Sequence, residues 1–276
     1  MSKITKLIIL TDIHILHNDG NIIGINPLAR LRQAIAHINR TQMDADLVIF
    51  TGDLTHHGEP KAYEIFKDEI AKLKLPCKLL IGNHDKRANF QSAFPRAEKD
   101  VNGFVQWHQD FGHWRVIGLD SVNDPPLPDT RHGAGQLCTK RLEYLTETMA
   151  ASGGKKIALF MHHHPFVSRF SGMDQIRLLD APRFAAALAG RNVRFLGMGH
   201  IHRFFSVAWQ GIMATVFKST VDQLPFDLET NDTALGTREA PGYGVVLLDD
   251  EQVIVHNVDY LTELSEEENG GAIRHT

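Results

Sequence analysis

Apolar segments and amphipathic segments alternate along the first third of the chain. Short runs rich in β-branched residues occupy 4–11, 46–51 and 77–81 and predict buried strands. Between them, apolar side chains recur at helical spacing over 27–39 and again from about residue 60 onward. The order strand, helix, strand, helix, strand predicts parallel strands joined by right-handed crossovers.

The pattern changes after residue 104. Residues 104–107 and 116–119 predict two antiparallel strands that flank a turn at Asp110–His113. A helix with Thr139 as its cap is predicted through about Met149. The later predicted elements are a strand at 156–161, a loop at 168–180, a helix at 181–188 and strands at 193–198, 204–209, 212–217, 243–248 and 252–258.

These elements predict an α/β fold, a four-layer α/β/β/α sandwich of two mixed sheets flanked by helices. One sheet would begin with the N-terminal strands, and the other would be built largely from C-terminal strands. The pattern contains no linker, so residues 1–276 are expected to form a single domain. Residues 220–276 remain a candidate appendage or oligomer contact.

Composition narrows the class of protein. The chain has 276 residues, is 43% hydrophobic and carries a net charge of −4, with its 29 Lys and Arg residues spread along the sequence. We therefore expect no nucleic acid polymer as partner. Because no run approaches the ~18 apolar residues of a membrane span, we expect a cytoplasmic protein with no membrane partner. Cys77 and Cys138 lack the spacing of a metal or redox motif and are expected to be reduced and half-buried.

Polar clusters rich in aspartate and histidine directly follow five of the predicted strands. They are Asp12-Ile13-His14, Gly52-Asp53, Gly82-Asn83-His84-Asp85, Met161-His162 and Gly199-His200-Ile201-His202. Each cluster alone is common turn chemistry, but their joint appearance after successive strands indicates one site. Asp53 offers two oxygens and can bridge two ions. Seven ligands with one bridging carboxylate fill two sites suited to in-line displacement at phosphorus.

The five clusters together resemble the full signature of the calcineurin-like metallophosphoesterases, over about residues 5–220. The resemblance implies two metal ions per chain, iron or manganese first, with zinc or cobalt also compatible with the ligands. It implies one site of Asp12, His14, Asp53 and His202 and a second site of Asp53, Asn83, His162 and His200. The fourth cluster reads Met161-His162-His163-His164-Pro165, with a histidine at 164 where relatives often have proline, so His163 remains an alternative to His162.

The resemblance also implies catalytic roles. The histidine of the family that matches His84 contacts phosphate, where it stabilises developing charge or protonates the leaving alkoxide. Asp85 would orient that imidazole or a ligand. A water acidified by the two metals would be the nucleophile. The polar residues that follow the first two clusters are candidate entrance and substrate contacts, and a solvated loop fits them equally well; they are His17, Asn18, His56 and His57.

Within the family, the chain looks most like the class III cyclic nucleotide phosphodiesterases and the bacterial glycerophosphodiesterases. The second cluster reads Gly52-Asp53-Leu-Thr-His-His-Gly58 and lacks the arginine with which protein phosphatases of the family hold a phosphomonoester. We therefore expect a small phosphodiester as substrate, 3',5'-cyclic nucleotides first. The alternatives are a glycerophosphodiester hydrolase, a broad phosphodiesterase, or a non-catalytic metal-binding scaffold. Residues Thr220–Leu235 are a candidate contact for a homodimer.

Overall fold

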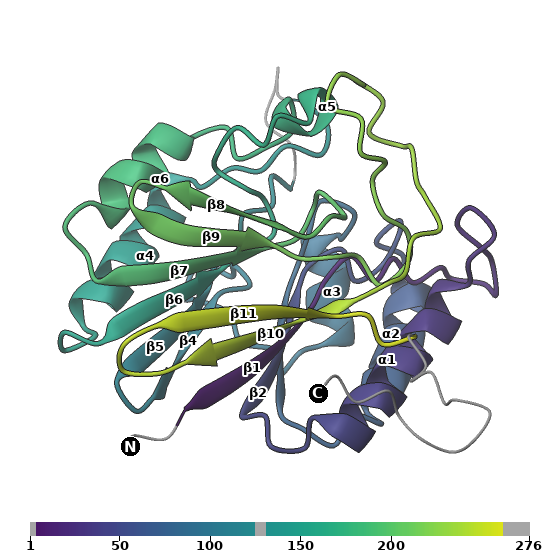
Figure 1. The fold of residues 1–276 in the computed structure, drawn as a ribbon, viewed down its shortest axis with the longest axis horizontal. Coiled ribbons are helices and arrows are strands. Elements are labelled where there is room, and N and C mark those ends of the chain that lie inside the picture. Colours follow the sequence, from purple (N-terminus) through teal and green to yellow (C-terminus); the bar gives the residue numbers. More distant parts are fainter. Residues whose placement is uncertain (1–3, 125–130, 262–276) are drawn as a thin grey trace, which may run out of the picture.

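Two β-sheets lie face to face in the structure, a computed structural model that describes residues 4–124 and 131–261 (Figure 1). The first sheet has the strand order β11-β10-β1-β2-β3. Its strands are β1 (Thr5–Leu10), β2 (Leu47–Thr51), β3 (Cys77–Leu80), β10 (Tyr243–Leu248) and β11 (Val253–Val258). The first three are parallel, and β10 pairs with β1 in the antiparallel sense.

The second sheet has the order β4-β5-β6-β7-β9-β8. Its strands are β4 (Trp107–Phe111), β5 (Trp114–Gly118), β6 (Lys156–Phe160), β7 (Val193–Met198), β8 (Phe205–Trp209) and β9 (Ile212–Val216). The four central strands are parallel, and the edge strands β4 and β8 are antiparallel to their neighbours.

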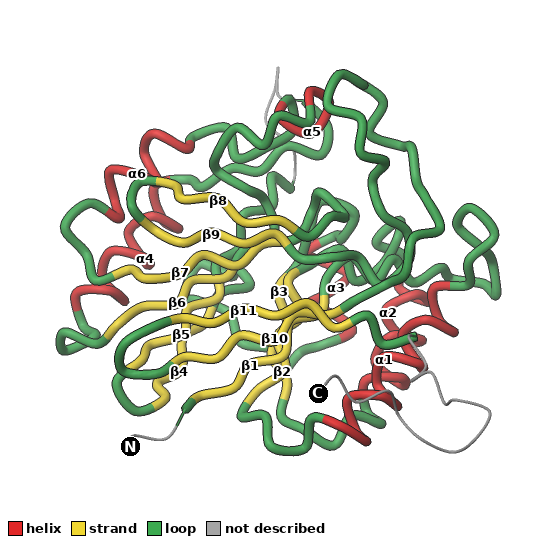
Figure 2. The backbone as a smooth tube through the Cα atoms, viewed as in Figure 1, coloured by secondary structure: helices red, strands yellow, loops and turns green. Residues whose placement is uncertain are grey.

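Helices cover the outer face of each sheet. The first sheet packs against α1 (Pro27–Thr41), α2 (Pro60–Ile70) and α3 (Arg87–Ala93), and the second packs against α4 (Thr139–Ala150) and α6 (Ala181–Leu188). The Asn26 side chain caps α1 by accepting the backbone N–H of Ala29 at 2.8 Å. The short helix α5 (Ser171–Asp174) lies among the long loops (Figure 2).

Strand periodicity explains the layers. In β1, Leu7 and Ile9 point into the core between the two sheets, whereas Ile8 and Leu10 point at the helices of the first sheet. In β6, Ala158 also faces the core between the sheets. Three apolar cores therefore separate four layers, which confirms the predicted α/β/β/α sandwich.

Several sequence predictions need correction. The predicted strand bounds at 104–107 and 116–119 are wrong, because β4 and β5 extend to a two-residue turn at Gly112-His113. β4 is an edge strand whose residues His108 and Asp110 are exposed, so its polar stretch resembled a loop. Thr139 does not cap α4; it is the first helical residue and follows Cys138.

The assignment of strands to sheets also differs from the prediction. The second sheet comes from the middle of the chain, residues 107–216, and the last two strands return to the first sheet. Residues 243–258, part of the region considered as an appendage, thus pair directly with β1 through β10. Two short helices, α3 and α5, were not predicted, and α5 falls in the predicted loop at 168–180.

Two further observations concern the cysteines and the helices. Both cysteines are free and half-buried, as expected from their spacing. In the part of the chain that the structure describes, no helix is both long enough and apolar enough to cross a membrane.

Candidate metal centre

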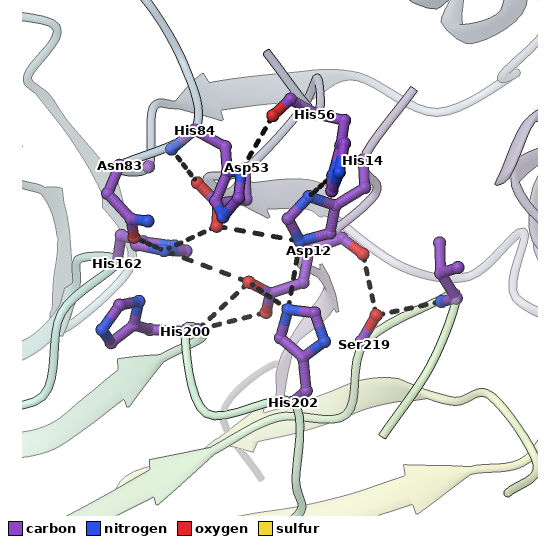
Figure 3. A network of polar contacts seen from close by, with 12 residues as sticks. Asp12, His14, Asp53, His56, Asn83, His84, His162, His200, His202 and Ser219 are labelled. Atoms are coloured by element: carbon purple, nitrogen blue, oxygen red, sulfur yellow. Dashed lines mark hydrogen bonds and ion pairs between the residues drawn. The ribbon is translucent and has the colours of Figure 1, made fainter. Parts of the chain in front are cut away.

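The five polar clusters come together where the loops after β1, β2, β3, β6 and β7 meet (Figure 3). Glycines make this close approach possible. A Cβ atom on Gly199 would lie 2.0 Å from the Thr11 hydroxyl oxygen, and one on Gly82 would lie 2.2 Å from Oδ1 of Asp53. A side chain at either position would therefore push two ligand-bearing loops apart.

Backbone strain is concentrated in these loops. Among the described residues, eight that are not glycine have left-handed φ angles, and five of them are predicted ligands. The five are Asp12, His14, Asp53, His200 and His202, with φ between 49° and 74°. Such conformations cost ~1–3 kcal/mol each and persist only where the surroundings enforce them, commonly at functional sites.

One group of donors consists of Asp12, His14 and His202. The Nε2 atoms of His14 and His202 lie 3.1 Å apart, and His202 Nε2 lies 3.4 Å from Oδ1 of Asp12. The outer nitrogen of His202, Nδ1, lies 3.1 Å from the carbonyl oxygen of Asp222. Because Nδ1–H donates to that carbonyl, Nε2 is the ring nitrogen that faces His14 and Asp12.

A second group surrounds His162. Its Nε2 atom lies 3.1 Å from Oδ1 of Asn83 and 3.3 Å from Oδ2 of Asp53, while Nδ1 lies 3.0 Å from the carbonyl oxygen of Thr51. His200 donates its backbone N–H to the Asp12 carboxylate, and its Nε2 lies 3.2 Å from the carbonyl oxygen of Ile176. That contact leaves Nδ1 of His200 as the nitrogen with a free lone pair.

Asp53 lies between the two groups. Its Oδ2 atom is 3.3 Å from Nε2 of His162 and 3.8 Å from Nε2 of His14. Its Oδ1 atom accepts the backbone N–H of His84 at 2.8 Å. The carboxylate therefore lies within 4 Å of a ring nitrogen from each group.

His163 faces a different direction from His162. One of its nitrogens lies within 4.8 Å of the ring nitrogens of His162 and His200. Both nitrogens have other partners, however, because Nδ1 lies 2.8 Å from the Ser121 hydroxyl and Nε2 lies 3.1 Å from the Gly133 carbonyl oxygen. His162, in contrast, directs Nε2 at Asp53 and Asn83.

The electrostatics of the centre favour positive charge between its carboxylates. Burial lowers the pKa of His162, but the nearby Asp53 carboxylate outweighs burial and raises that pKa to about 9. Burial likewise opposes protonation of His202, yet Asp12 raises its pKa well above the usual value. Burial and the neighbouring His84 imidazole hold the pKa of His14 well below its usual value. Protons therefore occupy positions from which metal cations would displace them.

The donor set is suited to metal binding. Carboxylate oxygens, one amide oxygen and imidazole nitrogens converge within hydrogen-bonding distances, and the outer nitrogens of the histidines are already engaged. Mixed nitrogen and oxygen donors of this kind suit borderline metals such as iron, manganese, zinc and cobalt.

Asp85 forms hydrogen bonds with both the loop after β2 and the loop after β3. Its carboxylate is fully buried and accepts hydrogen bonds from the backbone of Leu54, Thr55 and Gly82 and from the hydroxyls of Thr55 and Tyr63, at 2.9–3.2 Å. Burial, followed by repulsion from Asp53, raises the pKa of Asp85 to about 6. Among the described contacts, Asp85 makes none with the His84 ring, so it acts on the backbone that carries the ligands.

His84 faces a cavity of ≈ 460 Å³ above the donors. Its Nδ1 atom lies 2.8 Å from the carbonyl oxygen of His56, so Nδ1–H donates and Nε2 is left for a bound molecule. Of the four weakly predicted entrance residues, only His56 lines the cavity. His17, which pairs with Glu59 at 2.8 Å, lies outside it, as do Asn18 and His57; all three are exposed.

Sequence reasoning missed other parts of the cavity wall. His132 and Asp222 line it, and so do apolar residues from α5, the loop just after it and the segment after β9: Met173, Ile176, Leu224 and Leu235. None of these residues belongs to a motif. Their common signal is position in long loops beside the clusters, which becomes informative only once the chain is folded.

The fold and the converging donors define a class of metal-dependent hydrolases. The sequence matches the calcineurin-like phosphoesterase family over residues 5–204. The chain belongs to this family, and it is a metal-dependent hydrolase of phosphate esters.

Individual relatives agree with this assignment. The chain is 35% identical over 258 residues to a probable cyclic nucleotide phosphodiesterase of Rhodopseudomonas palustris, an alignment that covers 93% of each chain. It is 30% identical to a probable glycerophosphodiester phosphodiesterase of Arcobacter nitrofigilis, with 84% of each chain covered. In three dimensions it is similar to a dimetal phosphatase from Danio rerio, with a TM-score of 0.70 and 13% identity over 92% of this chain and 95% of that one.

Proposed function

We propose that the protein is a binuclear phosphodiesterase that acts on 3',5'-cyclic nucleotides. One ion would be held by Asp12, His14, Asp53 and His202, and the other by Asp53, Asn83, His162 and His200. The observation that carries the proposal is the position of Asp53, whose Oδ2 atom lies 3.3 Å and 3.8 Å from one nitrogen of each group. Iron or manganese is the proposed metal, and zinc or cobalt would fit the same donors.

When bound, the ions would stabilise charge on the phosphoryl oxygens and lower the pKa of the attacking water. The protein's own residues would contact the phosphate and protonate the leaving group. His84 lines the cavity with Nδ1–H fixed by the His56 carbonyl. Its Nε2 atom would contact the phosphate and, when it carries a proton, donate it to the leaving alkoxide. The remaining protein groups hold the substrate and keep the ligand loops in their strained conformations.

The cavity wall favours a diester over a monoester. Among the described residues that line the cavity, none is lysine or arginine. A phosphomonoester dianion would lack a cationic side chain there, whereas a diester carries a single negative charge. The volume of ≈ 460 Å³ lies in the range typical of small-molecule sites. Apolar residues in the wall offer a surface for a nucleobase.

A glycerophosphodiester is the second candidate substrate. It is favoured by the relative from Arcobacter nitrofigilis, which shares 30% identity and is named as a probable glycerophosphodiester phosphodiesterase. Its reaction would use the same ions and the same His84. The two substrates would differ in what they place against the wall of the cavity and in whether the leaving alkoxide stays attached to the product.

A direct comparison of substrates tests the proposal. Manganese-loaded protein would be assayed with cyclic AMP, glycerophosphoethanolamine, bis(p-nitrophenyl) phosphate and p-nitrophenyl phosphate. We expect kcat/KM for the diesters to exceed that for the monoester by about tenfold or more, with cyclic AMP ahead of glycerophosphoethanolamine. Dominant monoester hydrolysis would contradict the diesterase assignment. A preference for glycerophosphoethanolamine over cyclic AMP would make a glycerophosphodiester the first candidate substrate.

The His84→Ala variant separates catalysis from metal binding. We expect kcat to fall by about 10²–10⁴-fold while the metal content stays at two ions per chain. The control is His256→Ala, because His256 is an exposed residue of β11. Full metal content without turnover in the wild-type protein would favour a metal-binding scaffold.

We also propose a homodimer that uses part of the segment Thr220–Leu235. The first residues of this segment are buried inside the chain, but Phe226, Leu228 and Leu235 are exposed apolar residues. Light scattering coupled to size-exclusion chromatography would measure the mass. A single species near 31 kDa, the mass of one chain of 30.9 kDa, would contradict the proposal.

A further inference from the structure

The proposed ligand histidines differ in what holds their outer nitrogens. Histidine ligands generally donate this second N–H to a fixed acceptor, which sets the ring orientation and the nitrogen that binds the metal. For His162, His200 and His202 the acceptor is a backbone carbonyl, at 3.0–3.2 Å. For His14 the partner is a side chain, because its Nδ1 atom lies 3.2 Å from Nδ1 of His56 (Figure 3).

The proton positions follow from the geometry. His14 directs Nε2 at the ligand group, 3.1 Å from Nε2 of His202. A ligand nitrogen needs its lone pair, so the proton of a neutral His14 ring is on Nδ1. Nδ1 of His56 must then accept that proton's hydrogen bond, and His56 carries its own proton on Nε2.

His56 contacts His84 as well. Its carbonyl oxygen lies 2.8 Å from Nδ1 of His84, and the two rings stack with centroids 5.2 Å apart and an interplanar angle of 19°. The ring of His14 meets that of His84 edge to face, with centroids 4.7 Å apart. One residue therefore contacts both a proposed metal ligand and the proposed phosphate-contacting histidine.

We propose that His56 is a positioning residue that orients His14 for its ion through the acceptor at Nδ1 and supports His84 through stacking and its backbone carbonyl. The inference rests on the proposed two-metal function and extends it. It makes the site of His14 the one whose metal affinity depends on a replaceable side chain. The other three histidines keep their acceptors whatever side chain is substituted nearby.

A matched set of variants separates the acceptor from the ring. His56→Phe keeps a ring against His84 but removes the acceptor. His56→Asn and His56→Leu are close in shape and both lack the ring, yet only asparagine places an oxygen near the position of Nδ1. His256→Phe, the same exchange at an exposed position of β11, is the control.

The main readout is the release of metal. Zinc-loaded protein would be mixed with a chromogenic chelator, and the amplitude and rate of each release phase would be recorded. We expect His56→Phe and His56→Leu to release one of the two ions about 10–100-fold faster than wild type and the other at the wild-type rate. His56→Asn should stay within a few-fold of wild type, and His256→Phe should equal it. Thermal melting of the metal-free variants would verify that each is folded.

The outcomes distinguish this inference from the proposed function. A wild-type protein that binds fewer than two ions would overturn both. A wild type with two ions and a His56→Phe variant that releases both at the wild-type rate would overturn only the role of His56. His56→Asn releasing metal as fast as His56→Leu would also overturn that role, because the acceptor would then make no difference.

Discussion

The ligand loops of the first sheet and those of the second sheet are held in place by different means. The loops after β2 and β3 are linked by the Asp85 carboxylate. It accepts five hydrogen bonds from these two loops and from α2. The loop after β7 is held by several separate contacts with the segment that follows β9. The Leu224 N–H donates to the carbonyl oxygen of His202, and the Asp222 carbonyl oxygen accepts from the His202 ring.

This difference predicts how many ligand loops a single substitution disturbs. Substitution of Asp85 removes the hydrogen-bond acceptor of backbone N–H groups in two loops at once, and both loops carry proposed ligands. On the second sheet, losing one contact leaves the others in place. Comparable strain at the ligands, seen in the left-handed φ angles of Asp53 and His202, is therefore supported on one side by a carboxylate shared between two loops and on the other by separate contacts.

The largest effect is expected from Asp85→Ala. The substitution leaves buried N–H and O–H donors without an acceptor, so the free energy of unfolding should fall by roughly 3 kcal/mol or more. Metal content should fall with it, because the loops of Asp53 and Asn83 are released together. Urea denaturation and elemental analysis would measure both. Full metal content in the Asp85→Ala protein would show that the two loops keep their ligands in place without this carboxylate.

Metal affinity should depend on pH through His162. Its folded-state pKa of about 9 lies above the ordinary value of 6.5. The protonated ring therefore stabilises the metal-free protein fully below pH 6.5, and that contribution is lost as pH rises through 9. Because metal must displace this proton, affinity should rise over the same interval. Calorimetric titrations at pH 6.5, 7.5 and 9 would measure it, and a flat profile would argue against His162 as a ligand.

A smaller effect is expected from Ser219→Ala, which removes a contact between the segment after β9 and the ligand loop after β1. The Ser219 hydroxyl donates to the carbonyl oxygen of Asp12 at 2.9 Å and accepts the Val221 N–H at 3.0 Å, and both contacts are buried. Their loss should lower the free energy of unfolding by about 1–2 kcal/mol without loss of metal. If Ser219→Ala were as damaging as Asp85→Ala, the number of hydrogen bonds lost from the ligand loops would not determine the damage.

The smallest effect is expected from Asp222→Asn. The backbone carbonyl that holds His202 is unchanged, and only the carboxylate oxygen 3.5 Å from its Nδ1 is replaced. Metal affinity should fall by less than about tenfold. A larger loss in the same calorimetric titration would show that the carboxylate, and not the carbonyl, orients the ring.

The sequence could predict what is encoded locally. Apolar runs such as Leu7–Leu10 identify strands, and the donors that follow them identify a metal centre, because parallel strands deliver their C-terminal ends to one edge. The pairing of β10 with β1 joins residues more than 200 positions apart and has no local signal. The acceptor role of Asp85 and the place of His132 in the cavity wall depend in the same way on distant partners.

The return of β10 to the centre of the first sheet has a consequence for biosynthesis. β1 lies between β2 and β10, so until residues 243–248 leave the ribosome one edge of this strand, which is apolar from Leu7 to Leu10, has no partner. Unpaired edges of this kind recruit other strands and promote aggregation. Nascent chains and C-terminal truncations that end before β10 should therefore depend on chaperones, even though the last proposed metal ligand, His202, has by then been made.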